Sequence, residues 1–144
     1  MRCPQVVRGS AMVLLVAIAL LGSFESAMAD DPKPYIVKDG MVDKGTYNGW
    51  RRFHSVCYVC HGQGAVGTSF APSLVDSLKR LSYDDFLATV AQGREGNIGG
   101  VQRVMPSFAN VPDVMEYIDD IYAYLKARSD GAIGPTRPER FPTN

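Results

Sequence analysis

The sequence has 144 residues, 46% of them apolar, and its fifteen Lys and Arg side chains balance fifteen Asp and Glu side chains. Disordered chains combine low hydrophobicity with high net charge, and nucleic-acid-binding domains carry a basic excess, so this composition argues against both classes. It is typical of one small globular domain.

The first 29 residues have the pattern of an export signal. Two arginines precede an apolar run over residues 11–21, and the Ala-Met-Ala triplet at residues 27–29 is a small-x-small cleavage site. The apolar run is shorter than the ~20 residues that a membrane-spanning helix needs. We therefore expect a Sec signal peptide cleaved before Asp30, a periplasmic mature chain and no stable membrane insertion. Cys3 precedes the apolar run and leaves with the signal.

An extended lead-in is expected over residues 30–42, followed by a domain over residues 43–130. Asp43 is the expected N-cap of a first helix. Its apolar side chains recur at three- and four-residue steps, as in an amphipathic helix: Tyr47, Trp50, Phe53 and Cys57. The glycines of residues 62–71 then predict a loop.

A short second helix is expected after the capping-box pattern of residues 82–85. Four glycines then predict an irregular stretch through Met105, since no segment alternates strongly enough to predict a strand. The last helix is expected to begin near Asp113. Beyond it, the proline-rich tail of residues 131–144 cannot continue a helix. These elements predict an all-α fold with long loops.

Cys57, Cys60 and His61 form a C-x-x-C-H motif, which is the attachment signature of c-type haem. Two thiols three positions apart can each add to one haem vinyl group, and the adjacent imidazole is brought under the iron. A thioredoxin-type motif would need a βαβ setting, and a zinc site would need a second ligand pair, for which only His54 is left. A disulfide would explain neither His61 nor the loop. We expect one covalent haem c, with His61 as an iron ligand.

A second axial ligand is expected, because the iron of a small electron carrier is usually six-coordinate. The candidates are His54, Met41, Met105 and Met115. His54 lies three residues before Cys57 on the same helix and cannot easily reach the opposite haem face. Met115 is explained by packing in the last helix, and Met41 has no supporting context. Met105 is preferred, because the proline after it forbids helix and lets the thioether project from a loop.

Ligation by His61 and Met105 fills both axial positions, which suits one-electron transfer rather than catalysis. The expected protein is therefore a carrier and not an enzyme. If Met105 did not bind iron, the alternative would be a ligand-binding haem sensor or a peroxidase-like module with an open sixth position.

The sequence resembles the class I c-type cytochromes over nearly all of residues 43–128. Gly49, Phe53 and the C-x-x-C-H motif match the N-terminal helix of that family, in which the glycine lets the C-terminal helix cross closely. Residues 121–126 resemble the crossing helix. The resemblance implies the small class I fold, with three to four helices around one covalently bound haem.

Two further segments resemble the haem-binding parts of the same family. Residues 71–74 (Ala-Pro-Ser-Leu) are similar to the segment whose proline carbonyl accepts the second N–H of the haem histidine. This implies that Pro72 orients His61 and that Leu74 belongs to the cofactor site. Residues 104–108 are similar to the loop that carries the distal ligand.

A narrower resemblance links three stretches, residues 43–62, 71–93 and 119–134, to the methanol-metabolism-related, c-L-type cytochromes. Those proteins accept electrons from lanthanide-dependent methanol dehydrogenases that use pyrroloquinoline quinone (PQQ). The resemblance implies that this chain takes single electrons from a PQQ-dependent methanol or alcohol dehydrogenase. It would pass them to a downstream cytochrome or a terminal oxidase.

Overall fold

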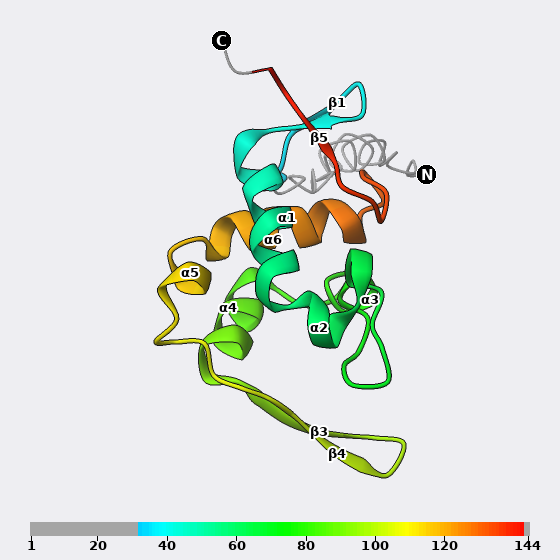
Figure 1. Cartoon of the computed structure of the whole chain (residues 1–144), viewed down its shortest axis with the longest axis vertical. Helices are drawn as coiled ribbons and strands as arrows, with labels where there is room; N and C mark the ends of the chain where they lie inside the picture. The colour runs from blue at the N-terminus through cyan, green and yellow to red at the C-terminus, as the bar shows by residue number, and fades with distance from the viewer. Residues whose placement is uncertain (1–31, 143–144) are drawn as a thin grey trace, which may run out of the picture. The chain divides into compact units, whose positions relative to one another are not determined.

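The computed structural model in Figure 1 describes residues 32–142. The predicted signal peptide with Cys3 and the last two residues of the tail lie outside the described residues. The described part contains six α-helices, one 3-10 helix and five short strands, in the order β1 (Val37–Lys38), β2 (Met41–Val42), α1 (Lys44–Val56), α2 (Tyr58–His61), η1 (Gln63–Ala65), α3 (Leu74–Ser77), α4 (Tyr83–Gln92), β3 (Arg94–Ile98), β4 (Val101–Met105), α5 (Pro112–Met115), α6 (Ile118–Ser129) and β5 (Glu139–Arg140). Over the same residues, no helix is both long and apolar enough to cross a membrane.

Helices α1 and α6 cross at the centre of the fold. Gly49 makes the crossing possible, because a Cβ at this position would lie 1.7 Å from the backbone oxygen of Asp120. Phe53 of α1 and Tyr124 of α6 are fully buried, and their rings pack with the centroids 5.5 Å apart. The close crossing that the resemblance implied is therefore present.

The predicted start of the first helix is confirmed. Asp43 is the N-cap of α1, and its carboxylate accepts the backbone N–H of Thr46 at 3.0 Å and the Thr46 hydroxyl at 2.5 Å. The start of the second predicted helix is confirmed in the same way, since the Ser82 hydroxyl accepts the backbone N–H of Asp85 at 3.1 Å before α4.

The structure corrects the prediction that no segment forms a strand, so the expected all-α fold is a mostly helical fold with some strands. β3 and β4 pair as an antiparallel hairpin, from Arg94 opposite Met105 to Ile98 opposite Val101. Figure 1 shows this hairpin extending away from the helices. Gly99 and Gly100 both have positive φ, as a two-residue hairpin turn requires. The strands were missed because most of their described side chains are exposed, so no alternating apolar pattern marks them.

The last helix is also divided, where a single helix was expected. Helix α5 ends at Met115, and Tyr117 leaves the helical region with φ −120° and ψ 22° before α6 begins. The Tyr117 ring lies under the guanidinium of Arg52, whose Cζ is 3.8 Å from the ring centroid. This contact joins the break between the two helices to α1.

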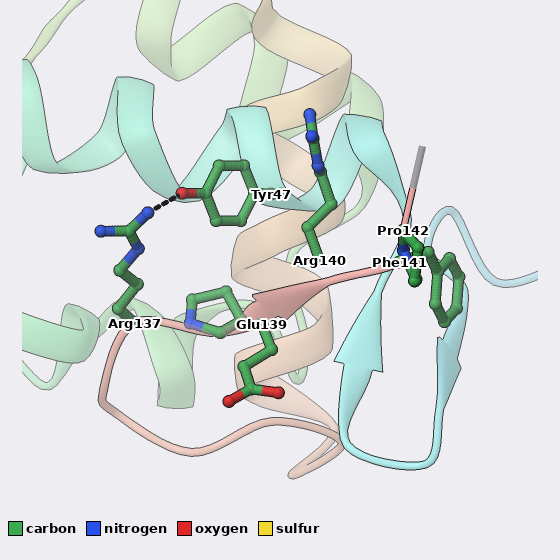
Figure 2. Close-up of a pocket in the computed structure, with 7 residues that line it drawn as sticks. Tyr47, Arg137, Glu139, Arg140, Phe141 and Pro142 are labelled. Carbon is green, nitrogen blue, oxygen red and sulfur yellow. Dashed lines mark hydrogen bonds between the residues drawn. The ribbon is translucent and has the colours of Figure 1, made fainter. Parts of the chain in front are cut away.

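The two ends of the domain meet in a small sheet with the order β1-β2-β5. β5 belongs to the proline-rich tail and runs parallel to β2, with Glu139 opposite Met41. Figure 2 shows the groove that the tail forms with the start of α1, in which Arg137 donates a hydrogen bond to the Tyr47 hydroxyl. Tyr47 precedes Cys57 by ten residues, or about 15 Å of helix, so this groove is separate from the C-x-x-C-H turn.

Candidate functional site

The C-x-x-C-H motif forms one compact turn at the junction of two helices. Cys57 is the C-cap of α1 and the N-cap of α2. Its backbone N–H donates to the Phe53 carbonyl at 2.8 Å, while its own carbonyl accepts from Cys60 at 3.2 Å and from His61 at 3.0 Å. These bonds place both sulfur atoms and the imidazole within a single turn. The local sequence is sufficient to build this arrangement.

The imidazole of His61 is buried and fixed in orientation. Its Nδ1 lies 3.0 Å from the carbonyl oxygen of Pro72. A carbonyl only accepts hydrogen bonds, so Nδ1 carries the proton and Nε2 keeps its lone pair. Burial lowers the pKa of His61, against a smaller opposing effect of the bond to Pro72. The neutral imidazole that a metal needs as a ligand is therefore favoured at neutral pH.

Pro72 is held in place by the loop that follows His61. Gly67 donates its N–H to the His61 carbonyl at 2.7 Å, and Thr68 donates its N–H to the Ala71 carbonyl at 2.9 Å. Gly67 has φ +87°, and a Cβ there would lie 2.6 Å from the backbone nitrogen of Ser73. Only glycine allows the loop to close this tightly. The loop thus positions the carbonyl that orients the imidazole.

The two thiols are present as free cysteines, with Cys57 partly buried and Cys60 exposed. Burial, with a smaller contribution from Cys60, raises the pKa of the Cys57 thiol to about 11. At neutral pH this thiol keeps its hydrogen. Addition across a vinyl group uses both the sulfur and that hydrogen, since one C–S and one C–H bond form.

Met105 is the last residue of β4, not part of an irregular stretch as predicted. It is half-buried and packs against the core cluster. Gly93, at the opposite base of the hairpin, has φ +77°, and a Cβ there would lie 2.6 Å from the Met105 carbonyl oxygen. After Pro106, the Phe108 N–H donates to the Val90 carbonyl of α4 at 3.0 Å. The backbone around Met105 is thus fixed against α4.

The remaining candidates occupy structural positions. Leu74 is the first residue of α3 and packs, half-buried, against the core. His54 places its Nδ1 2.8 Å from the Trp50 carbonyl oxygen, one turn earlier in α1. Met41 lies in β2, and Met115 ends α5 and packs against the core.

The residues around the motif fit a covalently bound haem. The donor set is two free cysteine thiols and one oriented, neutral imidazole. Large apolar side chains are exposed on all three segments of the site, as a flat apolar ligand requires. They reach 65% exposure at Val59 and 60% at Phe70, and belong to the motif, the loop after it and β4: Tyr58, Val59, Val66, Phe70, Val101 and Val104.

Two arginines make contacts that the sequence did not predict. Arg103 in β4 lies over the ring of Phe70, with its Cζ 5.4 Å from the ring centroid. Arg128 in α6 is buried and donates to the Gly64 carbonyl at 3.1 Å and to the Ile133 carbonyl at 2.7 Å. Each contact joins segments far apart in the sequence, so no local pattern could have indicated it.

The family model and the relatives that match this chain all carry cytochrome names. The family model described as cytochrome c oxidase, cbb3-type, subunit III, matches residues 46–125. Cytochrome c-553I of Paracoccus denitrificans is 40% identical over 111 residues, which are 77% of this chain and 49% of that protein. The chain thus spans about half the length of that relative. Cytochrome c-555 of Methylococcus capsulatus is 41% identical over 93 residues, which are 64% of this chain and 69% of that protein.

A solved structure is similar over most of the domain. It is the crystal structure of the c-type cytochrome XoxG from Methylobacterium extorquens AM1, with a TM-score of 0.63 and 40% identity. The alignment covers 78% of this chain and 75% of the XoxG chain.

Proposed function

The chain belongs to the cytochrome c family, whose members carry covalently attached haem c and transfer electrons rather than catalyse reactions, and from this premise we propose its role. It is a periplasmic one-electron carrier between a PQQ-dependent methanol or alcohol dehydrogenase and a downstream cytochrome or terminal oxidase. When bound, the haem iron supplies a site that accepts one electron and later releases it. Residues 1–29 direct export to the periplasm.

The proposed haem site uses six residues. Cys57 and Cys60 would hold the haem through thioether bonds, His61 and Met105 would ligate its iron, and Pro72 would orient His61. Leu74 packs at the proximal side. The observation that carries this proposal is the 3.0 Å contact from His61 Nδ1 to the Pro72 carbonyl, because it turns the other ring nitrogen into the single free ligand atom of a buried imidazole.

The donor is proposed from similarity and from the character of the surface. The relatives include a c-type cytochrome of Methylobacterium and one of Methylococcus, and three stretches of the chain resemble methanol-metabolism-related cytochromes. Tyr58 and Val59 expose apolar surface beside the two thiols. Transient redox pairs use interfaces of less than about 1,200 Å², so a small apolar patch beside the haem suits a partner that must leave quickly.

Stopped-flow mixing tests the donor. Purified PQQ-dependent methanol dehydrogenase, reduced with methanol, is mixed with the oxidised haem-loaded cytochrome, and haem absorbance is followed. We expect reduction at a rate that rises with dehydrogenase concentration, and none when methanol is omitted. Ascorbate provides the control that the haem itself is reducible. Reduction by ascorbate but not by micromolar dehydrogenase would overturn the donor assignment and leave the carrier function standing.

A further inference from the structure

Arg103 occupies a special position on the hairpin. It lies two residues before Met105 in β4, and residues two apart in a strand point to the same face. The residue opposite Arg103 in β3 is Gly96, which has no side chain. On the face that also carries Met105, the partner strand therefore places no side chain opposite Arg103.

One nitrogen of the half-buried Arg103 guanidinium lacks a hydrogen-bond partner in the described part of the chain. Its Nε is buried, yet it has no hydrogen-bond partner among the described residues. The contact to Phe70 supplies an aromatic face but no acceptor atom. A buried donor left without an acceptor costs about 1–3 kcal/mol, and more when it is charged. The Nε–H therefore needs an acceptor, and the positive charge of the guanidinium favours an anionic one.

The contact between Arg103 and Phe70 also locates that anion. Phe70 lies in the loop that follows His61 and ends at Pro72, while Arg103 lies on the strand that carries Met105. The contact therefore joins the segment on the His61 side to the segment on the Met105 side. A ring held between these two residues would have an edge at this contact.

We propose that Arg103 binds a haem propionate and so fixes the edge of the ring between the Phe70 loop and β4. This rests on the proposed ligation by His61 and Met105. The propionates are the only carboxylates of haem, and a guanidinium pairs with a carboxylate through directed, charge-assisted hydrogen bonds. Arg103 is a positioning residue: it balances the propionate charge, and an unbalanced negative charge near the iron would disfavour the added electron.

The test compares Arg103→Gln with Arg103→Lys and with Arg51→Gln, which removes one charge from an exposed position of α1. All are measured as haem-loaded full-length protein at pH 8, where a propionate is ionised. The readouts are the midpoint potential and the propionate bending band in the resonance Raman spectrum. This band reports hydrogen bonding to the carboxylate directly.

We expect Arg103→Gln to move the propionate band and to lower the ratio of reduced to oxidised protein at fixed potential about tenfold, or ~59 mV for one electron. Arg103→Lys keeps the positive charge but not the planar arrangement of donors. Its midpoint potential should therefore lie closer to the wild-type value than that of Arg103→Gln, while its propionate band should still differ from the wild-type band. Arg51→Gln should change neither readout. An unchanged band in Arg103→Gln would overturn the proposal, whether or not the potential falls.

Phe70→Leu distinguishes a hydrogen bond from Arg103 to the propionate from an indirect effect of the contact between Arg103 and Phe70. It removes the aromatic face but leaves Arg103, so the band should stay at its original position. The same band change as in Arg103→Gln would assign the effect to a loosened loop and overturn the proposal. If Met105 did not bind the iron, the wild-type protein would bind an exogenous ligand such as carbon monoxide. Failure of the proposed ligation can therefore be told apart from failure of the Arg103 proposal.

Discussion

The two proposed iron ligands are held in different ways. The ring of His61 is fixed by a hydrogen bond to Pro72 and by burial. Within the described residues the thioether of Met105 has no comparable directed bond, and its position depends on the strand backbone and on Gly93, which fits only as glycine. We therefore expect substitutions to displace the Met105 thioether more readily than the His61 imidazole.

Met105→Ala tests the sixth ligand. A thioether opposite an imidazole favours ferrous iron, so the variant should have a lower midpoint potential and its reduced form should bind carbon monoxide. Both are measured by spectroelectrochemistry and difference absorbance. Met115→Ala is the control: it should cost about 2 kcal/mol of unfolding free energy by opening the core, with an unchanged spectrum. If the wild type bound carbon monoxide as readily as Met105→Ala, the open-site alternative would be right.

Most of the proximal part of the site could be predicted, because its geometry is local. Cys57, Cys60 and His61 lie within five residues, and hydrogen bonds inside that stretch build the turn. Pro72 needed the family resemblance, since eleven residues separate it from His61. The contact of Arg103 with Phe70 could not be predicted, because it depends on where a hairpin with exposed faces folds back.

At the level of elements, the crossing of α1 and α6 is the contact on which the fold depends most. Both helices bury their central aromatic side chains there, and the backbones approach closely enough that Gly49 has no room for a methyl group. The apolar spacing predicted the two helices, while their crossing was implied only by the family resemblance at Gly49 and residues 121–126. The sequence could not predict the break at Tyr117, where the ring contacts Arg52 on another helix.

Gly49→Ala should reverse the usual effect of this substitution. In an exposed helix, alanine stabilises by about 1 kcal/mol relative to glycine. At Gly49 the methyl group would meet the Asp120 backbone, so we expect a loss of about 3 kcal/mol, measured by urea unfolding. Gly45→Ala in the same helix is the matched control. Its methyl group would meet the end of the flexible Asp120 side chain at 2.8 Å, so its stability should stay within about 1 kcal/mol of the wild type. Equal losses in both variants would contradict the steric explanation.

At the scale of the whole molecule, Arg128 joins three parts of the domain. It extends from α6 to the Gly64 carbonyl, three residues after His61, and to the Ile133 carbonyl at the start of the tail. The tail is packed here as well, since a Cβ on Gly64 would lie 2.7 Å from Pro135. One buried guanidinium thus joins the segment after His61 to the C-terminal tail.

Arg128→Met should destabilise the whole domain. The apolar side chain fills similar space but leaves two buried carbonyls without donors, for a loss of about 2–6 kcal/mol at ~1–3 kcal/mol for each unsatisfied group. Urea unfolding measures this, and faster proteolysis of the tail should accompany it. The control is Arg140→Met, which removes an exposed arginine of the same tail and should be nearly neutral. A neutral Arg128→Met would show that water replaces the arginine at both carbonyls.

The pairing of β5 with β2 has a practical consequence. Both strands adjoin the beginning of α1, whereas Cys57 stands at its other end, one 13-residue helix or about 20 Å away. Linkers at either boundary of the described domain would therefore leave from the side remote from the thioether turn. An electrode tether or a fused redox enzyme could be attached at that side without covering the surface around Tyr58 and Val59 that we propose for electron transfer.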